Sequence, residues 1–238
     1  MKTAAIIPAR LASSRLPGKV LLPIGGKPML WWVWRAACAA RVDAVHIATA
    51  DDEVAAAARA FGASVHRTRA DHASGTDRVA EVAERLDAEI IINVQADEPA
   101  LIPEVLNALL GAFADPNVAI ASAMCALPDA ETWTDPNAVK VVVDAVGDAR
   151  HFWRQPPATA RPADARLHVG LYAFRRARLL AFAATPPTPA ERIARLEQLR
   201  ALDHGWPIRM VAVDWRGHGV DTAADLARAR LLLSDDSS

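Results

Sequence analysis

Residues 3–8 read TAAIIP and residues 44–49 read AVHIAT, two short apolar runs separated by a polar loop to Lys19, a turn at Gly25-Gly26 and a helical pattern from about Pro28. Apolar runs that alternate with helical patterns are typical of βαβ units, which build a parallel sheet. The sequence therefore predicts an α/β fold with a mostly parallel central sheet.

The same rhythm continues along the first half of the chain. Asp51 is placed to cap a helix over 52–61 that Gly62 ends. Further strands are expected at 64–66, 89–94 and 118–124, and a helix opens at Pro103 and runs to Ala114. These segments make about five units of one α/β layer.

From Leu127 onward the pattern changes. Strand-like runs at 138–143 and 168–174 flank a loop rich in Pro and Ala at 155–165, and helices at 190–202 and 222–233 flank a strand at 208–213. We expect a single domain over 1–238 with an inserted smaller subregion at about 127–190.

Composition excludes several classes of protein. The chain has 238 residues, is 52% hydrophobic and carries a net charge of −1 with no basic block, which argues against nucleic acid as a partner. Its longest uncharged run, Pro116 to Pro128, is shorter than the roughly 20 residues of a membrane span. No secretory signal is evident, and two cysteines, Cys38 and Cys125, are too few for a disulfide framework. We expect a cytoplasmic protein with no membrane partner.

A basic loop follows the first strand. It places Arg10, Arg15 and Lys19 at the carboxyl end of that strand, where ligands of open parallel sheets bind. Guanidinium and ammonium groups suit a polyphosphate, and backbone amides around 12–14 could add to the cradle. A solvated surface loop is the alternative. The loop is neither a Walker loop nor a dinucleotide fingerprint.

Acidic residues mark two further segments. Asp97 and Glu98 follow an apolar strand, where they could hold a hard cation or cap the next helix. Asp221 precedes the last helix and could cap it or supply a second metal carboxylate. A small-residue turn over 69–78 could hydrogen-bond a base or sugar.

Taken together, these segments resemble the 3-deoxy-manno-octulosonate (Kdo) cytidylyltransferases, the CMP-Kdo synthetases. The resemblance rests on motifs that occur in the family's order over nearly the whole chain: PARLASSRLPGK from Pro8, GGKPM from Gly25, RADHASGTDR from Arg69, NVQADEP from Asn93, DPNAVKVV from Asp135, HVGLYAF from His168, LEQLR from Leu196 and GVDT from Gly219.

The resemblance implies a Rossmann-like nucleotidyltransferase fold and an enzyme that joins CTP to Kdo, giving CMP-Kdo and pyrophosphate for lipopolysaccharide biosynthesis. It implies that Arg10, Arg15, Lys19 and Asp97 are catalytic, the three cations holding the triphosphate. It places Pro8, Ala9, Ser74, Thr76 and Arg78 around the nucleotide, and Asp97 and Asp221 on Mg²⁺.

The same resemblance assigns the sugar acid to Gln95, His168, Tyr172, Glu197 and Gln198, and implies a homodimer in which the inserted part contributes to the interface. His168 and Tyr172 lie four apart, so on a strand they share one face. Glu197 and Gln198 are adjacent, so on a helix they would point in different directions.

Two positions depart from the family pattern. Ala96 stands where members usually have Gly, and Trp153 where they usually have Ser. Activation of another 3-deoxy-ulosonic acid, such as an 8-amino Kdo or a sialic-acid-like sugar, is therefore an alternative. A catalytically silent nucleotide-binding module is a second one.

Overall fold

The computed structural model describes residues 1–13, 15–156 and 161–233, and it divides into two compact units. The first contains residues 1–107 and 217–238, and the second contains residues 108–216. The expected inserted part, 127–190, falls within the second unit. Its proposed roles in sugar binding and dimerisation stay predictions.

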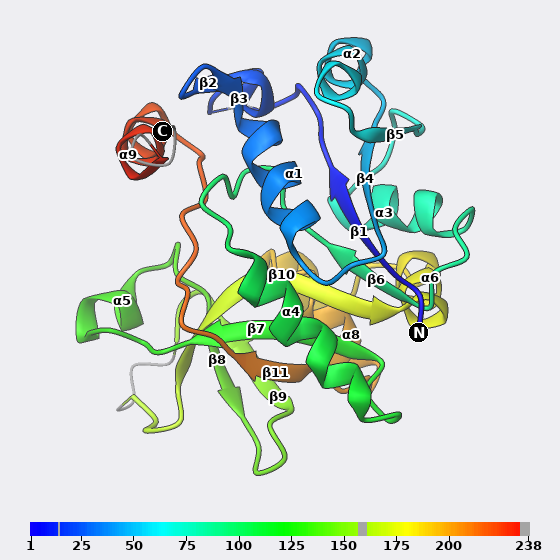
Figure 1. Cartoon of the computed structure of the whole chain (residues 1–238). Coiled ribbons are helices and arrows are strands. Elements are labelled where there is room, and N and C mark those ends of the chain that lie inside the picture. Colours follow the sequence, from blue (N-terminus) through cyan, green and yellow to red (C-terminus); the bar gives the residue numbers. More distant parts are fainter. Residues whose placement is uncertain (14, 157–160, 234–238) are drawn as a thin grey trace. The chain divides into compact units, whose positions relative to one another are not determined.

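The first unit contains a parallel sheet in the order β6-β1-β4-β5 (Figure 1). Its strands are β1 (Thr3–Pro8), β4 (Ala44–Thr49), β5 (Ser64–Arg67) and β6 (Ile90–Asn93). Residues 4–7 of β1 are each at most 1% exposed. A continuous apolar run of this kind is typical of a strand covered on both faces, which is why no alternation appears in the sequence.

Helices and a small hairpin complete this unit. The helices are α1 (Met29–Ala39), α2 (Asp52–Ala60), α3 (Gly75–Ala83) and α9 (Ala223–Leu233), and α4 (Pro103–Gly111) contains the boundary between the units. A 3₁₀ turn, η1 (Lys19–Leu21), precedes the hairpin of β2 (Pro23–Ile24) and β3 (Lys27–Pro28). Helix α9 packs through Leu226 against Ile24 and Trp32, so the C-terminal segment belongs to this core.

The second unit contains strands in the order β11-β7-β10-β8-β9. They are β7 (Ile120–Cys125), β8 (Lys140–Val143), β9 (Ala149–Trp153), β10 (Arg166–Arg175) and β11 (Arg209–Ala212). β11 runs parallel to β7, whereas β10 is antiparallel to β7 and β8, and β9 is antiparallel to β8. The short elements are η2 (Ala112–Ala114), α5 (Ala130–Thr134), α6 (Arg176–Ala184), α7 (Pro189–Ala194) and α8 (Leu199–Asp203).

One predicted helix, 190–202, is wrong because the structure has two helices there. Arg195 adopts a left-handed conformation, with φ 53°, and ends α7. Helix α8 then begins at Leu199, and the buried Arg200 pairs with Glu191 at 2.6 Å across the break. Glu197 and Gln198 therefore lie in a turn, where the helical argument against a shared direction does not apply.

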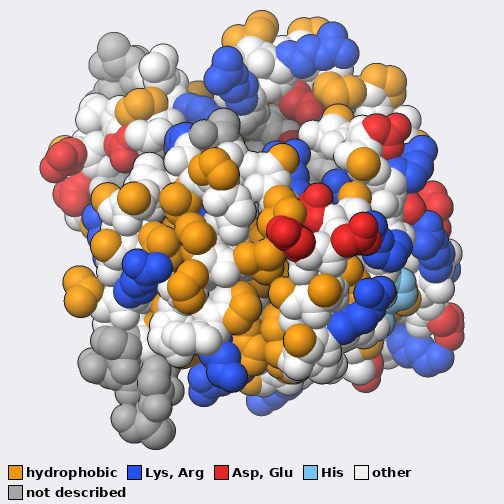
Figure 2. All heavy atoms as spheres, turned by 90° about the horizontal axis from the view of Figure 1, so that it is seen from above, with side chains coloured by type: hydrophobic (Ala, Val, Ile, Leu, Met, Phe, Trp, Pro, Cys, Tyr) orange, Lys and Arg blue, Asp and Glu red, His pale blue; other side chains and the backbone are white. Residues whose placement is uncertain are grey.

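The surface carries mixed charge. On the face shown in Figure 2, Lys and Arg side chains alternate with Asp and Glu side chains rather than forming one basic field. In the described part of the chain, no helix has both the length and the apolar composition to cross a bilayer.

Candidate active site

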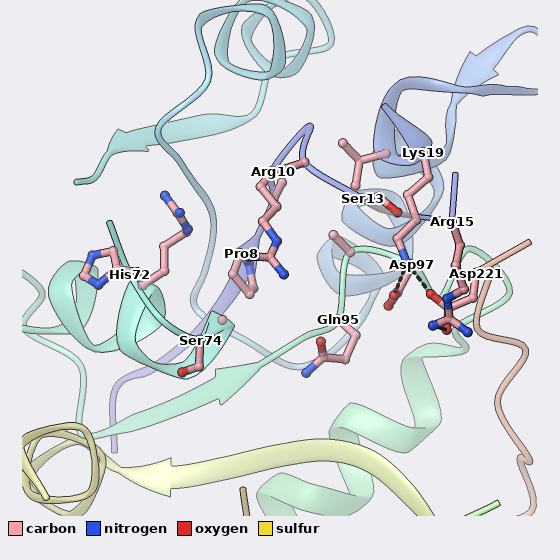
Figure 3. Close-up of a pocket in the computed structure, with 16 residues that line it drawn as sticks. Pro8, Arg10, Ser13, Arg15, Lys19, His72, Ser74, Gln95, Asp97 and Asp221 are labelled. Atoms are coloured by element: carbon pink, nitrogen blue, oxygen red, sulfur yellow. Dashed lines mark hydrogen bonds and ion pairs between the residues drawn. The ribbon is translucent and has the colours of Figure 1, made fainter. Parts of the chain in front are cut away.

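A cavity of about 730 Å³ opens within the first unit, at the carboxyl ends of β1 and β6. Its walls come from the loop after β1, the loop after β6, the start of α3 and the segment before α9 (Figure 3). The predicted site residues that line it are Pro8, Ala9, Arg10, Arg15, Lys19, Ser74, Arg78, Gln95, Asp97 and Asp221. Thr76 is not among the lining residues; its buried hydroxyl instead accepts a hydrogen bond from Asn93 Nδ2 at 3.2 Å.

The loop after β1 closes on itself. The Leu11 carbonyl accepts from Gly18 N–H at 3.0 Å, and Gly18 has φ 67°, a left-handed conformation that favours glycine. This turn directs Lys19 into η1. Ala12 and Ser13 of the expected amide cradle line the cavity, and Ser14 lies outside the described residues.

Lys19 joins two acidic residues that are far apart in the sequence. Its Nζ lies 2.6 Å from Asp97 Oδ2 and 2.9 Å from Asp221 Oδ1 (Figure 3). Arg15 Nη2 lies 2.7 Å from the other oxygen of Asp221. Burial acts to lower the pKa of Lys19, but the two carboxylates together outweigh it and the pKa is raised. The ammonium is therefore charged at neutral pH.

These carboxylates suit a divalent cation. Asp97 and Asp221 converge on one point, which the Lys19 ammonium takes in this structure. Mg²⁺ prefers hard oxygen ligands and usually takes only one or two protein carboxylates, completing its shell with phosphate oxygens and water. No group of three His, Cys, Asp or Glu residues in the described ranges is arranged to hold a metal. The pair therefore fits a metal that binds together with a phosphate ligand.

The capping alternatives for these acids are wrong. Helix α9 is capped by Thr222, whose Oγ1 accepts from Asp225 N–H at 3.2 Å while Asp225 Oδ2 accepts from Thr222 N–H at 2.9 Å. The Asp221 side chain is left to the two cations. Helix α4 begins at Pro103, and neither Asp97 nor Glu98 directs its side chain there.

Glu98 makes contacts that differ from the cation-ligand and helix-cap roles expected for the Asp97 and Glu98 pair. Its Oε2 accepts from His218 N–H at 2.8 Å, and a Cβ on Gly219 would stand 3.3 Å from its Oε1. Burial, followed by the negative charges of Asp97 and Asp221, raises the pKa of Glu98 to about 7. A backbone hydrogen bond opposes this shift. Only the folded chain brings these groups together, so the sequence gives no local signal for the contact with His218 or for the raised pKa.

The shifted pKa of Glu98 predicts how stability depends on pH. Because its folded pKa of about 7 lies above the ordinary value of 4.5, the native state binds more protons than the unfolded state between these values. Stability from this group is therefore lost as pH rises from 4.5 to 7. We expect Glu98→Gln to match the wild type near pH 4.5 and to be about 1–3 kcal/mol more stable at pH 8. Urea unfolding at both pH values measures this, and equal stabilities at pH 8 would contradict it.

The start of α3 forms another wall of the cavity. Ser74 caps this helix, its Oγ accepting from Asp77 N–H at 3.1 Å. A Cβ on Gly75 would lie 3.3 Å from Pro8 Cγ, so glycine allows the helix to approach the end of β1. Arg78 donates to the Arg69 carbonyl at 3.1 Å, and burial lowers the pKa of Arg78. These contacts fix the turn that the sequence placed near a base or sugar.

The other predicted sugar residues lie in the second unit. His168 and Tyr172 have ring centroids 5.5 Å apart, and His168 Nε2 lies 2.9 Å from Ser122 Oγ. The Ser122 hydroxyl also lies 2.9 Å from the Leu171 carbonyl, so Ser122 ties the His168 ring to the backbone of β10. Burial lowers the pKa of His168 to about 3 and raises that of Tyr172.

Glu197 and Gln198 lie near this cluster in different ways. Glu197 contributes to the raised pKa of Tyr172 and lies 3.6 Å from Arg200 Nη2. Gln198 is 6% exposed and directly precedes α8.

The two departures from the family pattern have different surroundings. Ala96 is 7% exposed and lines the cavity. Trp153 contacts His151 and Trp133, with ring centroids 4.6 Å and 6.3 Å away, whereas its neighbour Phe152 lies 5.0 Å from the His168 ring. Consecutive strand residues face opposite ways, so Trp153 lies on the face of β9 away from His168.

Comparison with known proteins agrees with this architecture. A solved structure of CMP:2-keto-3-deoxy-manno-octonic acid synthetase complexed with CTP superposes with a TM-score of 0.94 at 42% identity, covering 99% of this chain and 100% of the other. The fold is therefore that of a Rossmann-like nucleotidyltransferase. The family described as cytidylyltransferase matches residues 4–209, and the chain belongs to this family.

Two curated relatives are similarly close over their whole length. The 3-deoxy-manno-octulosonate cytidylyltransferase of Solibacter usitatus is 46% identical over 237 residues, covering 97% of this chain and 94% of the relative. The protein of the same name from Geobacter metallireducens is 46% identical over 242 residues, covering 95% of each.

Proposed function

We propose that this protein transfers CMP from CTP to Kdo, releasing pyrophosphate and giving CMP-Kdo. The observation that carries this function is the full-length similarity to a synthetase solved with CTP. The two relatives named 3-deoxy-manno-octulosonate cytidylyltransferase support Kdo as the sugar substrate. The cavity adds a physical reason, since basic side chains and carboxylates converge there within one unit.

The basic side chains are proposed to hold the triphosphate. Arg10, Arg15 and Lys19 come from one loop and line one cavity. Charge-assisted hydrogen bonds from such groups to phosphate oxygens are strong and directional. Pro8, Ala9, Ser74 and Arg78 are proposed to surround the nucleotide. Thr76 is buried and hydrogen-bonded to Asn93. It is proposed to hold α3 in place against β6 rather than to contact the nucleotide.

Phosphoryl transfer of this kind needs positioning and charge stabilisation more than covalent catalysis. The sugar hydroxyl attacks the α-phosphorus, a new P–O bond forms, and the bond to pyrophosphate breaks in line. Lys19 neutralises charge that develops on the phosphate oxygens, and Asp97 and Asp221 are proposed to hold Mg²⁺. Bound there, Mg²⁺ would polarise phosphate oxygens and help the hydroxyl lose its proton. Alternatively, the Asp97 carboxylate acts as a general base and accepts the proton of the sugar hydroxyl directly.

Gln95, His168, Tyr172, Glu197 and Gln198 are proposed to contact the sugar acid. The family resemblance also supports a homodimer, a cytoplasmic location and a role in lipopolysaccharide biosynthesis as parts of the proposal. Cys38 and Cys125 are both free thiols, as a reducing compartment requires.

A second candidate substrate is another 3-deoxy-ulosonic acid. Ala96 favours this alternative, because it adds a methyl group to a buried position of the cavity wall where the family usually has glycine. Trp153 does not, since it lies on the other face of β9 from His168.

One assay tests the proposal. Pyrophosphate release is measured with CTP and Kdo, an 8-amino Kdo or a sialic acid, each with and without Mg²⁺. We expect turnover with Kdo that requires Mg²⁺. Turnover confined to another sugar acid would replace the substrate, and CTP binding without any turnover would identify a silent module.

A further inference from the structure

The phosphate loop, of which the structure describes residues 9–13 and 15–19, has an anchor outside the cavity. Asp51 Oδ2 accepts a hydrogen bond from Leu11 N–H at 2.8 Å. The sequence placed Asp51 as the cap of α2, and it does occupy that position, but its side chain caps no amide of its own helix. Instead it reaches a loop 40 residues earlier in the chain.

Leu11 is the residue on which this loop closes. Its carbonyl accepts from Gly18 N–H at 3.0 Å, while its N–H is held by Asp51. The Ala9 N–H bonds the Ala48 carbonyl at 2.9 Å, which fixes the start of the loop against β4. Both backbone groups of Leu11 are thus engaged, and a shift at Leu11 moves both ends of the turn that presents Arg15 and Lys19.

Asp51 is itself held in place. Its N–H donates to Thr49 Oγ1 at 3.1 Å, and its carbonyl accepts from Ala55 N–H at 3.0 Å in the first turn of α2. The carboxylate therefore projects from a rigid strand-to-helix junction. Its charge also acts on Arg78, favouring the guanidinium that the charge of Arg10 disfavours. Asp51 thus acts on one cation of the cavity wall, Arg78, without being among the residues that line the cavity.

We propose that Asp51 is a positioning residue for nucleotide binding, because its hydrogen bond to Leu11 holds the phosphate loop in the shape that receives the triphosphate. This inference rests on the proposed function. A backbone N–H that loses its partner at a part-buried site costs free energy whenever the loop keeps this shape. Loss of the carboxylate should therefore favour other loop conformations in the free protein. Because CTP binds only the conformation seen here, its apparent affinity should fall.

Three variants test the inference. Asp51→Ala removes the acceptor, Asp51→Asn keeps an acceptor oxygen without the charge, and Asp52→Ala is the matched control. Asp52 is the next residue, and its side chain is 98% exposed and paired only with the surface residue Arg67 in the described contacts. Each variant is compared with the wild type by CTP titration calorimetry, by steady-state kinetics and by hydrogen exchange in peptides covering 9–19 and 52–61.

We expect Asp51→Ala to raise the Kd and the KM for CTP by about tenfold, with kcat at saturating CTP within about threefold. Exchange should rise in 9–19 and stay unchanged in 52–61. Asp51→Asn should recover most of the affinity, and Asp52→Ala should match the wild type.

Three results would overturn the inference. The first is wild-type CTP affinity in Asp51→Ala. The second is equal loss in Asp51→Asn, which would assign the effect to charge. The third is equal exchange in both peptides, which would mean a general loss of structure. Failure of the wild type to turn over Kdo would reject the proposed function, whereas the exchange and CTP-binding comparisons would still decide the role of Asp51.

Discussion

Lys19→Ala is expected to lower kcat/KM for CTP by about 10²–10³-fold, the loss typical of removing one charge-stabilising donor from an active site. The Lys19 ammonium lies within 3 Å of Asp97 and Asp221, so its removal also leaves two carboxylates facing each other without the cation between them. Both effects weaken triphosphate binding and stabilisation of the transition state. Pyrophosphate-release kinetics with saturating Kdo and Mg²⁺ measures this loss.

Lys27→Ala is the control for that variant. Lys27 is an exposed lysine of β3 in the same unit, and its contact with the Trp31 ring, 5.6 Å to the centroid, is a surface cation–π interaction. Circular dichroism should show the same fold in both variants. If the kcat/KM of Lys19→Ala for CTP lies within threefold of the wild-type value, Lys19 has no role in the proposed mechanism.

Asp97→Asn is expected to reduce kcat by about 10²–10³-fold. The carboxamide has nearly the shape of the carboxylate but lacks its charge, so it is a poor Mg²⁺ ligand and cannot act as a base. Because Lys19 then has only Asp221 as a carboxylate partner among the described contacts, it is more available to phosphate. Affinity for CTP without metal should therefore be kept or increased while turnover falls.

Calorimetry with CTP alone and turnover with Mg²⁺ separate these two effects. Glu104→Asn is a suitable control, because Glu104 is an exposed acid in the first turn of α4. A loss of CTP affinity without metal that equals the loss of turnover would contradict the division of roles between Lys19 and Asp97.

The parallel strands of the first unit could be predicted from sequence because their signal is local. Thr3–Pro8 and Ala44–Thr49 are short, largely apolar runs bounded by polar turns, and both are confirmed to the residue. The rule that ligands bind at the carboxyl ends of parallel strands directed attention to the segments of Lys19, Asp97 and Asp221, but that the two acids share one site was implied by the family resemblance.

The failures arise where tertiary contacts decide. Strand β9 was missed because Arg150 and His151 break its apolar pattern, and its pairing with β8 holds it in place. The break between α7 and α8 occurs at Arg195, a single residue in the left-handed conformation. Because this residue is not a glycine, the sequence does not indicate the break. For Asp51, a favoured capping residue stood at a capping position, yet the side chain bonds a distant loop. Sequence spacing cannot choose between a near partner and a remote one.

The first unit is discontinuous in the chain, since the segment from Gly217 through α9 rejoins residues 1–107. During synthesis on the ribosome, the strands and the phosphate loop emerge first, and Asp221 only after the whole second unit, residues 108–216. A nascent or prematurely terminated polypeptide would thus hold Lys19 and Asp97 but lack the second carboxylate and the packing of α9 against Trp32. Competence for catalysis is therefore acquired only after Asp221 and α9 have been synthesised.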